Sequence, residues 1–183
     1  MNFLILHGYG GYPNENWFPW LKEELEKLGH IVEVPQLPES EKPDLGKWMD
    51  EVAKYDEIFG GDLIIIGHSM GVTLGLRKLE TIENPIKAFI SVAGFAEKLD
   101  SRYDKVVKTF METQFDWEKI KQNCKSFYVY QSDNDSYVPV QAGEKLSKNL
   151  GAEFILVKNA GHFNSFAGYN KFESLLEKIK TIL

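Results

Sequence analysis

Residues 63–74 read LIIIGHSMGVTL, and this stretch decides the fold class of the chain. Four apolar residues lead into Gly-His-Ser-Met-Gly, and a helix-like run follows. Gly-x-Ser-x-Gly between a buried strand and a helix is the pattern of a nucleophile elbow, a tight turn that exposes a serine hydroxyl. So short a string recurs by chance, but its place between a strand and a helix favours a reactive Ser69 over a merely structural turn.

Short apolar runs alternate with helix-like segments on both sides of this stretch. The runs are nearly continuous, which is typical of parallel strands buried on both faces. The expected strands are 3–6, 31–34, 63–66, 88–92, 126–130 and 153–157, and the expected helices are 17–29, 45–55, 72–82, 140–151 and 171–183. The alternation predicts an α/β fold: a three-layer α/β/α sandwich with a parallel sheet of about six strands and helices on both faces.

The length and charge of the chain limit what kind of protein it is. Its 183 residues suit a single domain over residues 1–183, because one core serves roughly 100–200 residues. The formal net charge is -6, and acidic and basic residues are interleaved along the chain. A basic surface that tracks nucleic-acid phosphates is therefore not expected, and we predict no nucleic-acid partner.

The location of the protein is predicted from its cysteine content and its apolar runs. Cys124 is the only cysteine, so an intrachain disulfide is impossible, as suits a reducing compartment. The first residues lack the basic segment of a signal peptide, and no apolar run approaches the length that crosses a bilayer. These features predict a cytoplasmic protein with no membrane insertion.

Residues 95–123 interrupt the alternation of strands and helices with an amphipathic stretch. We predict that this insertion acts as a short lid and that its aromatic side chains line or cover an apolar pocket. Simple packing of the same side chains onto the sheet is an equally good interpretation. The aromatic residues concerned are Phe95, Tyr103, Phe110, Phe115 and Trp117.

A serine hydroxyl becomes a good nucleophile only when a base accepts its proton, and in this kind of fold the base follows the serine along the chain. The chain has four histidines, and only His162 comes after Ser69. It lies in the polar loop NAGHFNSF, between the last expected strand and the last expected helix. His162 is thus the predicted general base, whereas His68 is expected to pack beside the elbow.

The carboxylate that orients the base must come from a loop at a strand end between Ser69 and His162. Asp133 and Asp135 both follow an apolar strand in FYVYQSDNDSYVPV. The spacing to Val-Pro and the helix after it favours Asp135, and Asp133 is then expected to support the turn. The same segment fails as a calcium loop, because Tyr137 and Val138 occupy the positions of an oxygen ligand and a glycine. No metal site is predicted.

Acyl transfer also needs hydrogen-bond donors for the developing oxyanion. One expected donor is the backbone N–H of Met70, directly after the nucleophile. The other is expected in the glycine-rich loop after the first strand, where Tyr9 is the favoured donor and Gly10 a substitute. A phosphate-binding role for this loop is disfavoured, since it lacks both the Lys-Ser/Thr of a P-loop and the dinucleotide fingerprint.

These motifs, in this order, resemble the α/β-hydrolase superfamily, and more specifically its small serine-hydrolase branch of retinoblastoma-binding protein nine and the YdeN-like proteins. The similarity is carried over nearly the whole chain by HGYGG, GHSMG, VAGFA, FDWEKI, SDND followed by Val-Pro, and GHF. It implies the triad Ser69, Asp135 and His162. It also implies a compact hydrolase fold whose sheet lacks the first antiparallel strands of larger relatives.

We therefore expect a serine hydrolase that needs no cofactor and cleaves a carboxylic ester of a small-molecule substrate through an acyl-enzyme on Ser69. Thioester or amide cleavage would use the same residues and stays open. A catalytically silent binding protein on a hydrolase fold is the alternative from another class. The expected substrate pocket comprises Gly8, Gly10, His68, Phe95, Trp117 and Phe163.

Overall fold

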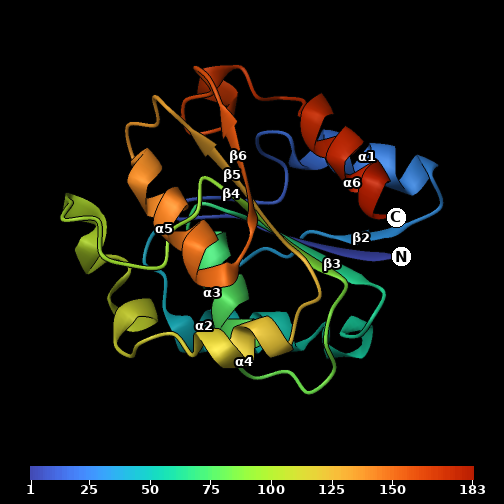
Figure 1. Ribbon diagram of the computed structural model, residues 1–183, viewed down its shortest axis with the longest axis horizontal. Coiled ribbons are helices and arrows are strands. Elements are labelled where there is room, and N and C mark those ends of the chain that lie inside the picture. Colours follow the sequence, from blue (N-terminus) through green and yellow to red (C-terminus); the bar gives the residue numbers. More distant parts are fainter.

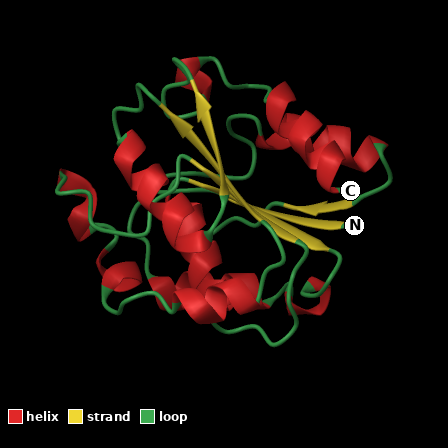
Figure 2. Ribbon diagram, viewed as in Figure 1, coloured by secondary structure: helices red, strands yellow, loops and turns green.

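A six-stranded parallel sheet forms the centre of the computed structural model, which describes all residues from 1 to 183 (Figures 1 and 2). The strand order is β2-β1-β3-β4-β5-β6, and every pairing is parallel. The prediction of six parallel strands is confirmed. The strands are β1 (Asn2–Leu6), β2 (Ile31–Glu33), β3 (Leu63–His68), β4 (Ala88–Val92), β5 (Phe127–Ser132) and β6 (Glu153–Val157).

Helices cover both faces of the sheet, so the predicted three layers are also confirmed (Figure 2). On one face lie α1 (Phe18–Lys27) and α6 (Glu173–Ile182), which run side by side near the N-terminal strand in Figure 1. On the other face lie four helices. They are α2 (Leu45–Ala53), α3 (Met70–Leu79), α4 (Trp117–Gln122) and α5 (Val140–Leu150).

Two hydrophobic clusters, one on each face, hold the layers together. Successive side chains of a strand point to opposite faces, so alternate residues of β1 enter different clusters. Phe3 and Ile5 pack with α1 and α6, whereas Leu4 and Leu6 pack with α2 and α3. All four side chains are fully buried. Burial on both faces explains why the central strands read as continuous apolar runs.

The end of α1 differs slightly from the expectation that it would continue to residue 29. The helix ends at Lys27, and Leu28 is its C-terminal cap, with half of its surface exposed. Gly29 follows with a φ of +83°, a left-handed conformation that glycine adopts without strain. Leu28 therefore lies outside the buried stripe formed by Leu21 and Leu25.

The segment 95–123 contains α4 and two 3-10 helices, η2 (Arg102–Lys105) and η3 (Lys108–Met111). Its second half is tied to α3 by Arg77, whose guanidinium donates hydrogen bonds to the carbonyl oxygens of Phe110, Thr113 and Gln114. Its first half instead borders the cavity described below. The role of this segment as a lid stays a prediction.

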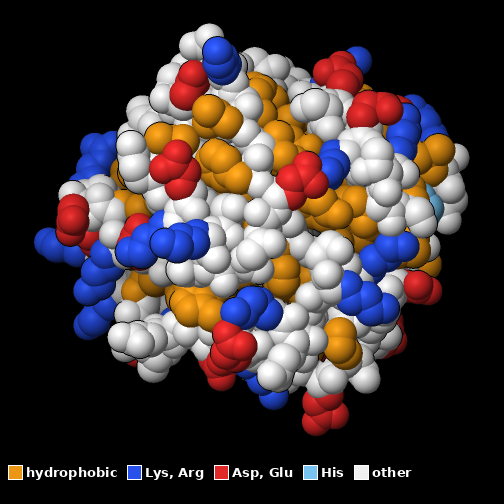
Figure 3. All heavy atoms as spheres, viewed as in Figure 1, with side chains coloured by type: hydrophobic (Ala, Val, Ile, Leu, Met, Phe, Trp, Pro, Cys, Tyr) orange, Lys and Arg blue, Asp and Glu red, His pale blue; other side chains and the backbone are white.

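The surface carries both signs of charge in close mixture. Figure 3 shows acidic and basic side chains interspersed over the face in view, with apolar side chains between them. None of the helices has the length and apolar character required to cross a bilayer.

Candidate active site

Ser69 lies at the turn between β3 and α3, where the backbone approaches itself closely. Its φ of +54° and ψ of -123° are strained for a residue with a side chain, as at a nucleophile elbow. A Cβ atom on Gly71 would lie 2.1 Å from the carbonyl oxygen of Leu6, and one on Gly67 would lie 2.6 Å from the Cα of Val72. Only glycine fits at both positions, and this requirement explains the spacing Gly-x-Ser-x-Gly.

The loops after β5 and β6 bring Asp135 and His162 together. The Asp135 side chain is fully buried, and its Oδ2 lies 2.7 Å from Nδ1 of His162. Its Oδ1 accepts hydrogen bonds from the backbone N–H groups of Tyr137, at 2.8 Å, and Val138, at 3.1 Å. A carboxylate can only accept, so Nδ1 of His162 carries the proton, and Nε2 keeps its lone pair free.

Three side chains of the β5 loop hold the segment that precedes His162. Asp133 Oδ1, Ser132 Oγ and Asn134 Oδ1 accept hydrogen bonds from the backbone N–H groups of residues 159, 160 and 161, at 2.7, 3.0 and 2.7 Å. Asp133 was expected to support the turn of its own loop, but its hydrogen bond supports the loop after β6. The contributions of Ser132 and Asn134 were not predicted, although the polar run SDND directly after an apolar strand was visible in the sequence.

His68 joins the elbow to the histidine loop from the other side. Its Nε2–H donates a 2.8 Å hydrogen bond to the carbonyl oxygen of His162, and its ring packs against Trp17 and Phe18. Burial and, to a smaller extent, the neighbouring His162 lower the pKa of His68 to about 3, against a hydrogen bond to the His162 carbonyl that raises it. His68 is therefore neutral in the folded protein near pH 7, and the predicted packing beside the elbow is observed.

Replacing His68 by glutamine is expected to flatten the pH dependence of stability in mild acid. The unfolded chain binds a proton at His68 below its ordinary pKa of 6.5, whereas the folded chain does so only near 3. The wild type therefore loses up to about 1.4 kcal/mol per pH unit through this group as the pH falls from 6.5. Urea unfolding of both proteins at several pH values measures the difference; parallel curves would contradict the assignment.

The glycine-rich loop after β1 approaches the Ser69 side chain. A Cβ atom on Gly8 would lie 3.3 Å from the Ser69 hydroxyl oxygen, so this glycine leaves the space beside the hydroxyl open. Met70 is the first residue of α3, where N–H groups have no acceptor within the helix. Gly10 is not available as a substitute donor, because its N–H donates to the carbonyl oxygen of Ser40 at 2.8 Å.

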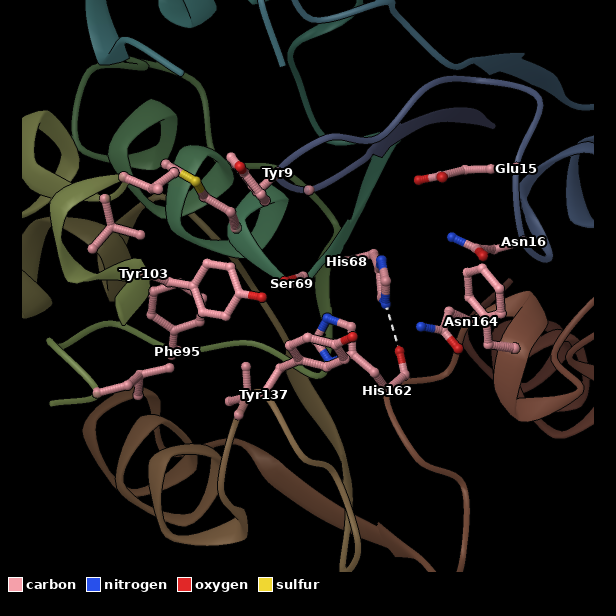
Figure 4. A pocket seen from close by; sticks show the side chains of 17 residues that line it. Tyr9, Glu15, Asn16, His68, Ser69, Phe95, Tyr103, Tyr137, His162 and Asn164 are labelled. Atoms are coloured by element: carbon pink, nitrogen blue, oxygen red, sulfur yellow. Dashed lines mark hydrogen bonds between the residues drawn. The ribbon is translucent and has the colours of Figure 1, made fainter. Parts of the chain in front are cut away.

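A cavity of about 300 Å³ opens over Ser69 and His162 (Figure 4). Three of the six expected substrate-pocket residues line its wall: Gly8, His68 and Phe95. The residues predicted for catalysis and the oxyanion site also line it, except Asp135: Tyr9, Ser69, Met70 and His162. Tyr103, from the insertion, also lines it, and its ring contacts those of Tyr9 and Tyr137. Lining residues that were not predicted are Glu15, Asn16, Leu99, Val106, Val107, Tyr137, Val138, Asn164 and Phe166.

Gly10, Trp117 and Phe163 were predicted to line this cavity, and for these residues the prediction is wrong. Gly10 lines a separate surface depression beside Glu39. Trp117 is the first residue of α4, and its ring lies 5.3 Å from that of Phe115. It packs against the hydrophobic cluster on the sheet face that α2 to α5 cover.

The Phe163 side chain is fully buried on the other face of the sheet, where its ring stacks on that of Phe172 at 5.2 Å. Its carbonyl oxygen accepts a hydrogen bond from the indole of Trp17. The backbone at Phe163 has a φ of +50°, so the side chain after His162 turns inward. For Phe110 and Phe115 the packing interpretation also holds, because both are buried in the core and do not line the cavity.

Comparison with known proteins gives one family and a set of close structural neighbours. The family model described as serine hydrolase matches residues 3–181. The chain is 29% identical to YdeN of Bacillus subtilis (strain 168) over 167 residues, which cover 90% of this chain and 87% of that protein. It is 25% identical to serine hydrolase RBBP9 of Rattus norvegicus over 186 residues, covering 98% and 94% of the two chains.

Solved structures of similar proteins have the same fold as this chain. The crystal structure of the ydeN gene product of B. subtilis superposes with a TM-score of 0.94 and 27% identity, covering 99% of this chain and 97% of that one. Est1E of Butyrivibrio proteoclasticus, solved with ferulic acid bound, has a TM-score of 0.73 at 19% identity, covering 98% and 89%. Because the identity to Est1E is only 19%, this similarity shows a shared fold and nothing more.

Proposed function

Because the chain belongs to the serine hydrolase family and is a YdeN- and RBBP9-like protein of the α/β-hydrolase fold, we propose that it hydrolyses carboxylic esters through an acyl-enzyme on Ser69. One observation carries the proposal. The buried carboxylate of Asp135 fixes the proton of His162 on Nδ1, and the imidazole borders the same cavity as the strained Ser69. A nucleophile, a base with a free lone pair and an orienting acid are the requirements of this chemistry.

The first half-reaction forms the acyl-enzyme. Nε2 of His162 accepts the proton of the Ser69 hydroxyl while Oγ attacks the ester carbonyl. Negative charge develops on the carbonyl oxygen, where the N–H groups of Met70 and Tyr9 stabilise it. His162 then gives its proton to the departing alcohol oxygen. Asp135 remains ionised and stabilises the imidazolium that forms in between.

The second half-reaction releases the acid. Water enters the site vacated by the alcohol, and Nε2 of His162 accepts one of its protons as the water oxygen attacks the acyl carbon. Collapse of the tetrahedral intermediate returns the proton to Ser69 Oγ. The carboxylic acid leaves, and the resting enzyme is restored.

The apolar residues in the cavity wall favour binding of an apolar acyl group of the ester. Five apolar residues that line it, from the insertion and the loop after β5, belong to or pack against one hydrophobic cluster: Phe95, Leu99, Val106, Val107 and Val138. A volume of about 300 Å³ is at the small end of ligand pockets, so short acyl chains are favoured over long ones.

Hydrolysis of p-nitrophenyl esters of increasing chain length tests this function. We expect saturable turnover of the acetate and butyrate, a lower kcat/KM for long chains, and only background hydrolysis by the Ser69→Ala protein. A folded wild type that binds these esters without turning them over would contradict the proposal and favour the silent binding protein.

A further inference from the structure

The cavity has two chemically different ends, with Ser69 and His162 between them. Figure 4 shows Phe95, Tyr103 and Tyr137 to one side of these residues, and a polar group to the other side. We call this group, Glu15, Asn16 and Asn164, the polar end. It is built from the loop before α1 and the loop after β6. Its side chains play no part in the mechanism described above.

The two asparagines of the polar end present hydrogen-bond donors to the cavity. Asn16 Oδ1 accepts hydrogen bonds from the backbone N–H and the hydroxyl of Ser165, at 2.9 and 3.3 Å. Asn164 Oδ1 accepts from the N–H of Ala167 at 3.0 Å. These bonds fix the orientation of both amides, because only the oxygen can accept. Their NH₂ groups consequently point toward the centre of the cavity in Figure 4.

Glu15 adds the only formal charge of the cavity wall. The lining residues include no lysine or arginine, and Glu15 forms no salt bridge. Burial raises the pKa of its carboxyl group, against a backbone hydrogen bond at Tyr12 that lowers it. A cation placed beside this carboxylate would replace part of the lost hydration, whereas an anion would be repelled.

The role of His162 as the acid that protonates the leaving oxygen places the alcohol part of the ester at the polar end. His162 donates its proton to the leaving oxygen, and Asn164 follows His162 by two residues on the same loop. Phe95 and Tyr103 lie toward the opposite side, where the acyl chain would extend, whereas the exposed Phe166 belongs to the same loop as Asn164.

We propose that Glu15, Asn16 and Asn164 form a leaving-group subsite that selects esters with a cationic alcohol. The two amides hold the hydrogen-bond acceptors of that alcohol, and the Glu15 carboxylate pairs with its positive charge. This inference rests on the proposed esterase function and adds a substrate class to it. It also disfavours polyanionic leaving groups, such as the nucleotide part of a coenzyme thioester.

The test compares butyrylcholine with 3,3-dimethylbutyl butyrate, which has the same shape and acyl chain but no charge. We expect kcat/KM to be about fivefold to tenfold higher for the cationic ester. The Glu15→Gln protein is expected to reduce this ratio to near one. Asn164→Asp keeps the oxygen that accepts from Ala167 and adds a negative charge, so it is expected to raise the ratio.

Glu118→Gln is the matched control for a change of net charge, because Glu118 lies exposed on α4 and pairs only with Lys121. It should leave the ratio as in the wild type. Equal kcat/KM for the two esters in the wild type, or a charge preference that Glu15→Gln retains, would overturn the inference while leaving the esterase function intact.

If the protein turns over neither ester, a binding measurement tests the leaving-group subsite separately from the proposed esterase function. Calorimetric titration of the Ser69→Ala protein with each ester reports the charge preference without chemistry. Tighter binding of butyrylcholine that Glu15→Gln removes would support the subsite even in a protein that hydrolyses neither ester. Equal affinity for the two esters would overturn it.

Discussion

Asp135→Asn is expected to lower kcat for ester hydrolysis by about ten-thousand-fold without unfolding the protein. In the wild type, Oδ1 of Asp135 accepts two backbone N–H groups and Oδ2 faces Nδ1 of His162. An asparagine has one accepting oxygen, which the backbone N–H groups of Tyr137 and Val138 retain. Its NH₂ group then donates to Nδ1, which moves the imidazole proton to Nε2 and removes the lone pair needed by Ser69.

The measurement is kcat for p-nitrophenyl butyrate at neutral pH, with thermal unfolding as the check of the fold. Asp133→Asn is the matched control, because Asp133 lies two residues away and accepts only from the N–H of Asn159. An amide oxygen can accept that bond equally well, so activity within about threefold of the wild type is expected. The opposite result, with Asp133→Asn inactive and Asp135→Asn active, would make Asp133 the acid of the triad.

Arg77→Met is expected to reduce the free energy of unfolding by about 3–5 kcal/mol. The Arg77 side chain is 6% exposed, and its guanidinium pairs with Glu80 and lies over the ring of Phe115 at 3.7 Å. It also satisfies carbonyl oxygens of the insertion at Phe110 and Thr113. Methionine fills much of the space but leaves those carbonyl oxygens without their donor, and the Glu80 carboxylate keeps only its hydrogen bond from the Asp116 N–H. Urea denaturation of the purified proteins measures the change.

Lys78→Met is the matched control for Arg77→Met. Lys78 is the next residue of α3 and is also buried, but its partner Asp56 is 57% exposed and stays hydrated when the lysine is lost. The expected cost is about 1 kcal/mol or less. Equal effects of the two substitutions would show that the contacts of Arg77 with the insertion do not stabilise the fold.

The strands and the elbow could be predicted because their causes are local in the sequence. Burial on both faces makes β3 a continuous apolar run, and the close backbone approach at Gly71 admits only glycine. His162 could be proposed by elimination, since no other histidine follows Ser69. For the strands and the elbow, a single short segment contains the physical requirement.

The wall of the cavity could be predicted only in part, because it depends on how distant loops meet. Glu15 and Asn164 are far apart in the sequence, and neither carries a motif. Trp117 shows the converse problem. An aromatic pattern marks a side chain as buried, but the choice between the cavity and the layer beside Phe115 is made by tertiary packing. The positive φ at Phe163 likewise accompanies a ring that turns into the core.

The central claim is that Ser69 is an activated nucleophile, and covalent labelling tests it most directly. The purified protein is treated with a fluorophosphonate probe, and the modified residue is located by mass spectrometry. Labelling of the wild type at Ser69, lost in both Ser69→Ala and His162→Ala, is the result that we predict. A folded wild type that stays unlabelled, or that is labelled equally well without His162, would contradict the account.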